Sequence, residues 1–449
     1  ANDNGVISQW FEVLRDGRRE FTHIREFTAS GPVRELAVEH SRKGFMALSA
    51  DNHVDLFHAT GQSRLLSEVI GQGRIDTLVL SPRNNSLLVE SGERFQFFHG
   101  KNVHPEVTWS ALWQKIWYEG YPEPQYVWQS TSASDDFEAK LSLVPLAFGT
   151  LKAAAYAMLF AVPIAVAGAI FAGYFMSPGM RKVVKPTVEI MAALPTVILG
   201  FLAGLWLAPM VEQHLPGVFL MLILLPLAML VTAFAWHLLP RAFRDNVPDG
   251  WQALLLVPVL LLVGWACVAG SPLLEGWLFG GNARGFIIND LGMRFDQRNS
   301  LIVGIAMDFA VIPTIFSIAE DAVFSVPKHL TQGSLALGAT PWQTLSRVVI
   351  LTASPGIFSA VMMGLGRAVG ETMIVLMATG NTPIMDMSIF QGLRTLAANI
   401  AVEMPESEVG SSHYRVLFLA AFVLFVFTFV FNSVADYVRQ RLREKYSSL

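Results

Sequence analysis

The chain has 449 residues, of which 53% are hydrophobic and 15% charged, and its mean hydropathy is +0.44. This composition lies outside the range of soluble globular proteins and indicates a membrane protein. The net charge of −4 gives no reason to expect nucleic-acid binding. The sequence lacks the Gly-x-x-x-x-Gly-Lys-Ser/Thr loop that holds a nucleotide phosphate, and its histidines show no metal-ligand spacing. We therefore expect neither an ATPase site nor a metal site in this chain.

Residues 1–107 are predicted to form an all-β module. LSADNHVDLF (48–57) and LVESGERFQFF (88–98) share an apolar pair, a polar turn and an alternating strand. Their offset of about 41 residues is close to the period of a propeller blade. Two repeats do not close a ring, so we expect an incomplete, propeller-like module, with a β-sandwich as the alternative. Because the chain opens ANDNGV, without a start methionine or a leader, we expect that an export segment has been removed or lies upstream of residue 1.

An aromatic connector is predicted over 108–142, and a transmembrane domain over 143–449. Seven apolar segments follow the connector, each long enough for the roughly 20 helical residues that cross a bilayer. The segments lack the strict alternation of apolar and polar residues that is typical of a β-barrel. The domain is therefore predicted to be mainly α-helical and polytopic. The segments are 143–175, 187–208, 217–239, 251–271, 301–320, 356–378 and 414–435.

Lysines and arginines are unevenly divided between alternate connections, and this predicts the orientation. The loops 209–216, 272–300 and 379–413 hold four such residues, whereas 176–186, 240–250, 321–355 and the tail hold eleven. We expect the second set to be cytoplasmic and the β module to be periplasmic. The eleven residues are Arg181, Lys182, Lys185, Arg241, Arg244, Lys328, Arg347, Arg439, Arg441, Arg443 and Lys445.

The loop 321–355 is predicted to hold two short helices joined by a glycine turn. Pro327 suits the first turn of one helix and Gly338 its left-handed end. Thr340 and Gln343 form a Thr-x-x-Gln capping box for the next helix, with Pro341 at its first position. Such a pair of helices either docks in a groove of a partner and passes force to the spans, or rests on the lipid headgroups as an amphipathic hairpin.

The stretch GLGRAVGETM (364–373) places Arg367 and Glu371 inside an apolar segment. A lone charge at the bilayer centre costs roughly 2.5–3.5 kcal/mol, so both side chains are expected to face away from lipid. One interpretation is an intrahelical ion pair that neutralises itself. The other is that Arg367 presents its planar fork to a crossing oxyanion, while Glu371 prevents trapping or binds a protonated oxygen. Gly366 and Gly370 favour close helix packing.

One further acidic residue lies within an apolar run. Asp308 is placed in GIAMDFAVIP (304–313), a segment predicted to span the membrane. It is interpreted either as a second gate element or as a polar contact.

Four stretches resemble the permease C subunit of the phosphate-specific (Pst) ABC transporter. QGSLALGATPW (332–342) resembles the "EAA" coupling loop of ABC-importer permeases, with Gln332 in place of the usual glutamate and Leu351 in place of the usual closing proline. The others are LVPLAFGTLKAAAYAMLFAVPIAVAGAIF (143–171), EIMAALPTVILGFLAGLWLAP (189–209) and GLGRAVGETMIVLMATGNT (364–382). The external β module and the apolar pair 217–271 have no counterpart in short members of that family.

The resemblance implies the ABC importer permease fold and an inner-membrane subunit that carries inorganic phosphate. It implies a homologous permease partner, two ATPase subunits that bind ATP and Mg, and a periplasmic phosphate-binding protein; no cofactor is expected on this chain itself. Path or gate residues would be Arg367, Glu371 and Thr372; ATPase-coupling residues would be Gln332, Leu335, Gly338, Ala339, Thr340 and Trp342. The alternatives are a permease for sulfate, molybdate or phosphonate, a membrane sensor of external phosphate, and an ion-coupled secondary carrier, which the coupling loop disfavours.

Overall fold

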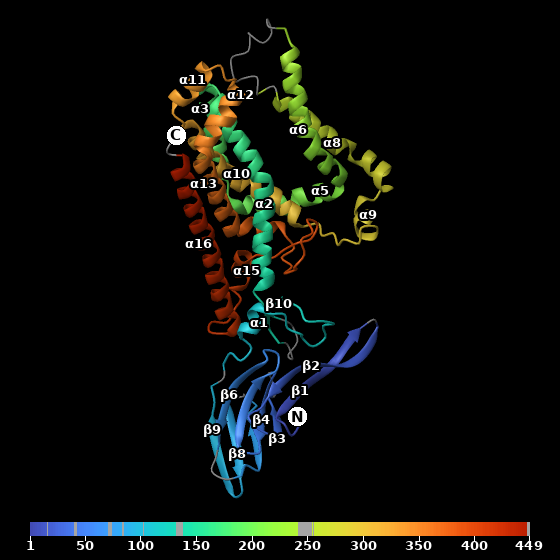
Figure 1. Cartoon of the computed structure of the whole chain (residues 1–449). Helices are drawn as coiled ribbons and strands as arrows, with labels where there is room; N and C mark the ends of the chain where they lie inside the picture. Colours follow the sequence, from blue (N-terminus) through green and yellow to red (C-terminus); the bar gives the residue numbers. More distant parts are fainter. Residues whose placement is uncertain are drawn as a thin grey trace. The chain divides into compact units, whose positions relative to one another are not determined.

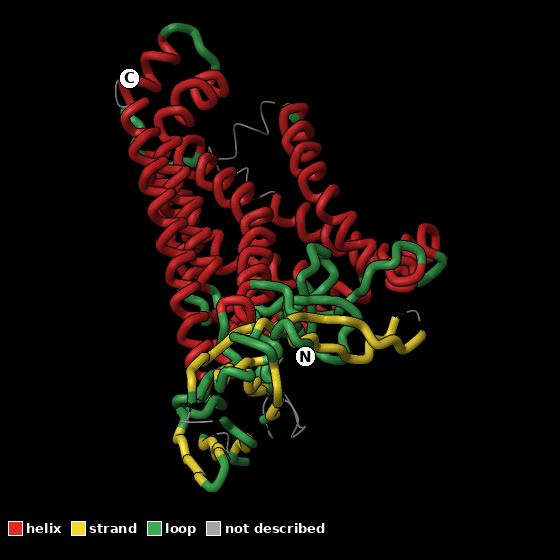
Figure 2. The backbone as a smooth tube through the Cα atoms, turned by 60° about the horizontal axis from the view of Figure 1, so that its bottom comes forward, coloured by secondary structure: helices red, strands yellow, loops and turns green. Residues whose placement is uncertain are grey.

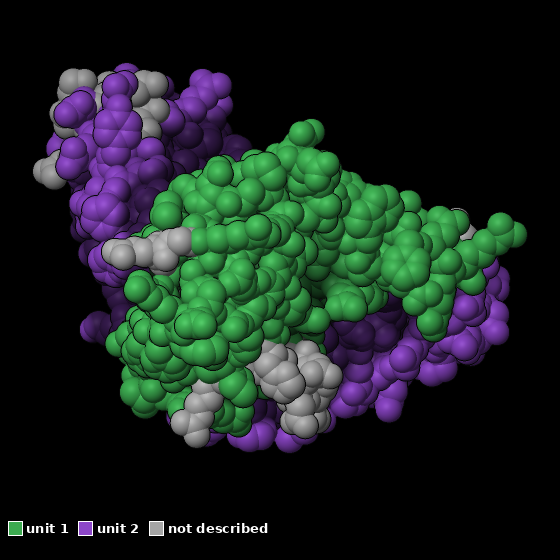
Figure 3. Space-filling model, turned by 90° about the horizontal axis from the view of Figure 1, so that it is seen from below, with its two compact units in different colours: residues 1–146, 402–420 green, residues 147–401, 421–449 purple. Residues whose placement is uncertain are grey.

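The computed structural model describes residues 1–449 apart from 16, 40–42, 71–73, 83–84, 102, 132–137, 241–253, 255 and 447–449. The chain divides into two compact units, coloured separately in Figure 3. Unit 1 comprises Ala1–Leu146 and Val402–Ala420, and unit 2 comprises Ala147–Ala401 and Ala421–Leu449. The predicted basic loop 240–250, with Arg241 and Arg244, lies outside the described residues.

Unit 1 contains every strand that the structure describes, drawn in yellow in Figure 2. Its connector holds one short helix, α1, and a small two-stranded ladder. The bounds are β1 Val6–Arg15, β2 Arg18–Thr28, β3 Val33–Val38, β4 Gly44–Ser49, β5 His53–His58, β6 Ser63–Val69, β7 Thr77–Leu80, β8 Ser86–Ser91, β9 Arg94–His99, α1 Trp109–Trp113, β10 Trp128–Gln129 and β11 Lys140–Leu141.

The two sequence repeats fold as two antiparallel meanders. One is the four-stranded sheet β3-β4-β5-β6, and the other is the three-stranded sheet β7-β8-β9. The turns fall at the predicted polar positions, where Asn52 and Gly92 adopt the left-handed conformation, with φ of +60° at each. Residues from both sheets, among them Leu48, Ile75 and Val89, share one apolar core. Within the described residues no propeller is formed, so that part of the prediction is not supported, whereas the β-rich module is present.

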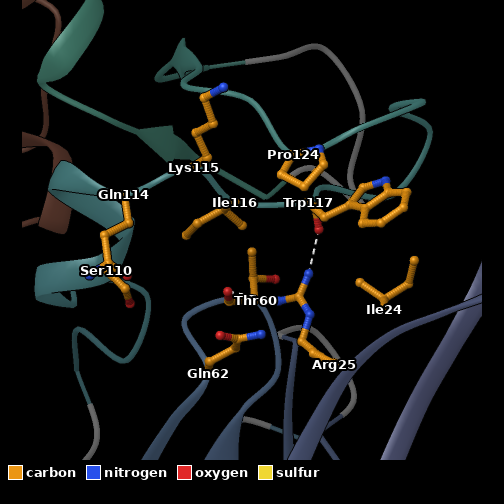
Figure 4. A pocket seen from close by; sticks show the side chains of 10 residues that line it. All are labelled: Ile24, Arg25, Thr60, Gln62, Ser110, Gln114, Lys115, Ile116, Trp117 and Pro124. Atoms are coloured by element: carbon orange, nitrogen blue, oxygen red, sulfur yellow. Dashed lines mark hydrogen bonds between the residues drawn. The ribbon is translucent and has the colours of Figure 1, made fainter.

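A buried arginine joins the β module to the connector. Arg25 of β2 donates to the backbone oxygens of Ala59 (2.6 Å), Thr60 (2.7 Å) and Trp117. Figure 4 shows the Trp117 bond at a cavity of about 110 Å³. Burial lowers the pKa of Arg25 below its usual range, yet its Nη1 and Nη2 groups donate hydrogen bonds to the three carbonyls. Arg25 therefore acts as a structural clamp.

Unit 2 is helical, and several of its helices contain single π-helical turns. The bounds are α2 Val144–Ile170 with the π turn η1 Phe171–Phe175, α3 Pro178–Ala192, α4 Thr196–Leu202, η2 Ala203–Leu207, α5 Ala208–Gln213, α6 Leu215–Leu238, α8 Leu256–Phe279, α9 Ala283–Asn289, α10 Ser300–Phe324, α11 Lys328–Ala336, α12 Pro341–Thr344, η4 Leu345–Val349, α13 Ile350–Gly370, α14 Met373–Ala378, α15 Leu396–Glu403 and α16 Ser412–Tyr446. Figure 1 labels most of these elements. Three of the helices, α2, α15 and α16, lie partly in unit 1.

Seven helices among the described residues are long and apolar enough to cross a membrane, as the sequence predicts. Three of them differ from the predicted segments. The segment predicted at 251–271 is observed at Leu256–Asn289, so the span extends into the predicted loop 272–300. The segment predicted at 187–208 is observed at Thr196–Gln213, because 176–186 is not a loop: it forms most of helix α3, which Ser177 caps. The segment predicted at 356–378 is observed at Pro341–Gly370, because α12, η4 and α13 form one helix of 30 residues.

Helix α10 is the central helix of unit 2, with 67% of its most apolar window buried. One neighbour, α2, carries alanines at every fourth position: Ala153, Ala157, Ala161, Ala165 and Ala169 are all buried. Another neighbour, α13, carries Gly356, Ala360, Gly364 and Ala368 at the same spacing. A Cβ at Gly364 would clash with Ile315 of α10, so this small-residue stripe permits the close packing.

The extra apolar pair forms a helical hairpin, which joins the main core through Leu215 and Val218 at the start of α6. Helices α6 and α8 lie side by side, apart from the bundle of α2, α10 and α13 (Figure 1). Only 6% and 11% of their apolar windows are buried. Gly217 is needed at their contact because a Cβ would clash with the Cys267 carbonyl. Its N–H donates to Ser271 Oγ at 3.2 Å. Most of this apolar surface is therefore available to lipid.

Candidate functional site

The predicted helical hairpin is present after α10. Helix α11 ends in a Schellman motif: Gly338 N–H donates to Leu335 O (3.0 Å) and Ala339 N–H to Ser334 O (3.2 Å). Gly338 has a φ of +86°, which permits this ending. Thr340 and Gln343 then form the capping box of α12, with bonds of 3.2 and 2.9 Å. Pro327 precedes α11 as its cap instead of lying in its first turn.

The tip of this hairpin exposes large apolar side chains. Leu337 is 92% exposed, Trp342 68% and Leu335 43%. Gln332 and Thr340 are also exposed, whereas Ala339 is half-buried. Helix α11 contains no buried residue. An apolar tip of this kind marks a surface that a partner or a lipid face covers.

The base of the hairpin is anchored to the bundle. Leu345 and Val349 are buried against Val323 and Val326 at the end of α10. Ser334 and Thr344 share a hydrogen bond of 2.9 Å, which joins the two short helices. Packed side chains therefore connect the base of the hairpin to the end of α10 and the start of α13.

An ionic cluster fixes α3 beside the same end of α10. Glu320 is fully buried and pairs with Arg181 and with Lys185, at 3.0 Å from the latter. Lys185 also bonds Asp321 at 2.5 Å. Burial alone would lower the pKa of Lys185, but its bonds to Asp321 and Glu320 raise that pKa above its usual value. Two of the lysines and arginines predicted to mark the cytoplasmic side thus have structural partners here.

Arg367 lies near the end of a helix instead of at its middle. Helix α13 stops at Gly370, Glu371 has an extended backbone (φ −67°, ψ 127°), and α14 begins at Met373. Arg367 is half-buried, and its Nη1 donates to the hydroxyl of Thr314 on α10 at 2.8 Å. Broken helices at membrane depth occur where the chain is buried in protein or borders an aqueous path.

The intrahelical ion pair between Arg367 and Glu371 is not formed. Instead, Glu371 Oε1 accepts hydrogen bonds from the N–H groups of Thr372 (3.1 Å), Met373 (3.1 Å) and Ile374 (3.2 Å). The carboxylate therefore caps the start of α14. Thr372 is half-buried, and its hydroxyl bonds the Gly370 carbonyl at 3.2 Å. Within the described chain, Thr314 is the one hydrogen-bond partner of the Arg367 guanidinium, which leaves further N–H groups free to donate.

We expect Glu371→Ala to lower the free energy of unfolding by about 1 kcal/mol, because three N–H groups lose their cap. Glu371→Gln retains an amide oxygen in the same place and is expected to lose much less. Thermal unfolding of the purified protein in detergent measures both. Equal losses in the two variants would show that the negative charge matters more than the cap.

Among the described residues, no close helix approach requires glycine at Gly366 or Gly370. A Cβ at Gly366 would make an ordinary contact of 3.5 Å with Asn432, and one at Gly370 would meet nothing. The stripe from Gly356 to Ala368 packs α13 against α10 instead. A role for Gly366 and Gly370 at a subunit interface stays a prediction.

Sequence reasoning missed one buried cation. Lys152 of α2 is 3% exposed, and its Nζ has no hydrogen-bond partner among the described residues. The carboxylates of Asp386 and Asp296 act on it electrostatically. The signal was present, since this lysine interrupts the apolar run LAFGTLKAAAY. Asp308 is also buried, and its Oδ1 has no partner in the described chain, so the structure supplies no polar contact for that oxygen.

Among the residues that the structure describes, no group of three or more His, Cys, Asp or Glu side chains is placed to hold a metal ion. The candidate site consists instead of a charged helix break, formed by Arg367, Thr314 and Glu371, and a separate hairpin with an apolar tip. Together these features define a polytopic helical membrane protein of the transporter class.

The chain belongs to the family of binding-protein-dependent transport system inner membrane components, whose model matches residues 164–444. It is therefore a multi-pass inner-membrane permease component of an ABC transporter, and a transport protein instead of an enzyme. The family implies ATPase subunits and a substrate-binding protein as partners.

Relatives of this chain include permeases with 27–29% identity. A probable ABC transporter permease protein, YqgH, of Bacillus subtilis (strain 168) is 27% identical over 68% of this chain and 74% of its own length. The phosphate transport system permease protein PstC of Mesorhizobium japonicum is 29% identical over 67% of this chain and 74% of its own. The phosphate transport system permease protein PstC 1 of Mycobacterium tuberculosis is 27% identical over 65% of this chain and 70% of its own length.

Proposed function

We propose that this chain is the permease subunit of an importer for inorganic phosphate. The observation that carries the proposal is the free guanidinium of Arg367. It is positioned by Thr314, is not neutralised by Glu371, and lies where α13 breaks. Guanidinium binds tetrahedral oxyanions through two parallel hydrogen bonds. Similarity to two PstC permeases supports phosphate as the anion.

In this proposal the chain pairs with a homologous permease and encloses the path with it. Two ATPase subunits supply ATP hydrolysis, and one of them receives the hairpin tip at Leu335, Leu337 and Trp342. A phosphate-binding protein delivers the anion on the periplasmic side, where the uneven distribution of Lys and Arg predicts that the β module also lies. Closure of the ATPases pushes the hairpin and exposes Arg367 alternately to each side.

Anion-dependent ATP hydrolysis by the reconstituted complex tests the anion. With the binding protein present, we expect phosphate to stimulate hydrolysis several-fold, and sulfate, molybdate and a phosphonate to leave it near the basal rate. The matched control is the same complex without binding protein. Stimulation by sulfate or molybdate equal to that by phosphate would reassign the substrate, and hydrolysis without any anion uptake would favour a sensor.

A further inference from the structure

A second group of arginines lies in unit 2, apart from Arg367. A cavity of about 340 Å³ is bordered by the stretch between α9 and α10 and by the stretch that follows α14. We call it the arginine pocket; its polar lining includes Arg284, Arg294, Arg298, Gln297, Thr382 and Gln391. The volume equals that of roughly ten water molecules, enough for a small anion with part of its hydration shell.

Two of the three guanidinium groups are free to bind an anion. Arg284 is held by Glu212 at 2.6 Å and lies 5.6 Å from the centre of the Phe295 ring. Arg294 and Arg298 have no ion pair and no side-chain hydrogen bond within the part of the chain that the structure describes. Both side chains are exposed, so their placement involves no burial of charge.

The carboxylate on the pocket wall does not neutralise them. Asp296 Oδ2 accepts a hydrogen bond from Gly392 N–H at 3.0 Å, which holds the two bordering stretches together. Asp296 and Asp386 act electrostatically on Lys152, and Glu212 pairs with Arg284. These three carboxylates leave one positive charge of Lys152, Arg284, Arg294 and Arg298 in excess. The pocket is therefore a site for negative charge.

A buried amide in the pocket wall also lacks a partner. Gln391 is 5% exposed, and its Oε1 has no hydrogen-bond donor among the described residues. Its backbone oxygen accepts from Ser300 N–H (3.0 Å) and Ser300 Oγ–H (2.6 Å), which fixes it at the start of α10. A buried oxygen left unpaired costs about 1–3 kcal/mol. A protonated oxyanion such as hydrogen phosphate offers both the charge for the arginines and an O–H donor for this amide.

The position of the pocket relates it to Arg367. The pocket is at the N-terminal end of α10, and the coupling hairpin follows the C-terminal end. Thr314, the partner of Arg367, lies 14 residues along α10, about 21 Å from Ser300 at 1.5 Å per residue. Helix α14 connects the two places, because Glu371 precedes it and Gly380 and Thr382 follow it.

We propose that the arginine pocket is a second oxyanion site, which holds the anion before it reaches Arg367. This inference rests on the proposed function, since it assumes that the chain conducts an oxyanion. Its arginines would raise the local anion concentration at the end of the path remote from the ATPases. Their planar forks and the Gln391 amide would favour a protonated tetrahedral anion.

Equilibrium dialysis of the purified permease–ATPase complex against radiolabelled inorganic phosphate, without binding protein, tests the proposal. We expect the unmodified complex to show two classes of site. The double variant Arg294→Gln/Arg298→Gln should weaken one class at least tenfold, whereas Arg367→Gln should weaken the other. Arg294→Lys/Arg298→Lys keeps both positive charges but loses the paired N–H donors of the guanidinium groups, and should give an intermediate affinity for phosphate.

The matched control is Arg439→Gln/Arg441→Gln, which removes two positive charges from α16. Phosphate binding by Arg294→Gln/Arg298→Gln equal to that of this control would overturn the proposal. The proposal would also be overturned if Arg294→Gln/Arg298→Gln bound phosphate normally but no longer co-eluted with the binding protein. The two arginines would then serve to dock that protein. If the unmodified complex shows one class of phosphate site, which Arg294→Gln/Arg298→Gln weakens and Arg367→Gln does not, the pocket stands and the proposed role of Arg367 in the path falls.

Discussion

Arg367→Gln is expected to reduce phosphate uptake by about 100-fold or more, while the complex still assembles. The guanidinium is held by a 2.8 Å bond to Thr314 and has further N–H groups to offer. Glutamine keeps a polar side chain but loses the positive charge and the paired N–H donors of the guanidinium. If two charge-assisted hydrogen bonds are weakened by about 3 kcal/mol in total, the rate of uptake is expected to fall by roughly 150-fold. Uptake of radiolabelled phosphate in proteoliposomes measures the loss.

Two control variants separate a role in the path from a role in folding. Thr314→Val removes the hydroxyl that positions Arg367 but keeps its charge, so uptake is expected to fall by about tenfold at most. Arg439→Gln removes an exposed arginine that pairs with Asp436 at 2.8 Å, and should transport like the unmodified protein. Co-purification with the ATPase subunits reports assembly. Unchanged uptake by Arg367→Gln in an assembled complex would exclude Arg367 from the path.

The hairpin was predictable because its signals are local. A left-handed glycine, a proline at the first helical position and a capping box each act within about four residues. The hairpin turns of the β module were predictable for the same reason: Asn52 and Gly92 sit at positions that require a positive φ. Closure of a ring depends on contacts between distant strands, and no local pattern specifies it.

The break after Gly370 was not predictable, because GETMIVLMA contains no proline and favours a continuous helix. Residues far away in sequence help to determine it. A Cβ at Gly200 would lie 2.8 Å from Met373 O, and one at Gly204 would clash with Met377 O. These glycines let α14 lie against α4, and Glu371 then caps its first turn. The sequence therefore identified Arg367 and Glu371 as exceptional. Of its two interpretations the ion pair is not formed, and the role in the path stays a prediction.

The arginine pocket was likewise not predictable from the sequence. Arg294, Arg298 and Gln391 lie in connections that the sequence marked only as external loops. Their grouping depends on the bond between Asp296 and Gly392, which joins stretches about a hundred residues apart. Charge counting predicted the orientation of those loops. It did not predict which charges would meet, because that depends on tertiary packing.

The second large effect is expected at Gly338: Gly338→Val should uncouple ATP hydrolysis from uptake. The φ of +86° is left-handed, and a β-branched residue there costs about 1–2 kcal/mol or more, since its Cβ approaches the backbone. A Cβ at this position meets no other atom within 4 Å, so the expected effect comes from the backbone and not from a clash. The Schellman ending would open, and Leu337 and Trp342 would lose their common orientation.

Gly338→Asn is the matched variant, because asparagine tolerates the left-handed conformation. It adds atoms to the same exposed surface but preserves the angle between α11 and α12. We expect Gly338→Asn to retain at least half of the uptake per ATP hydrolysed, and Gly338→Val to fall at least tenfold in that ratio. Both are measured in one proteoliposome assay that counts phosphate taken up and ATP consumed. An equal loss in the two variants would mean that bulk at the ATPase contact, and not the backbone conformation, limits coupling; no loss in either would exclude the hairpin as the lever.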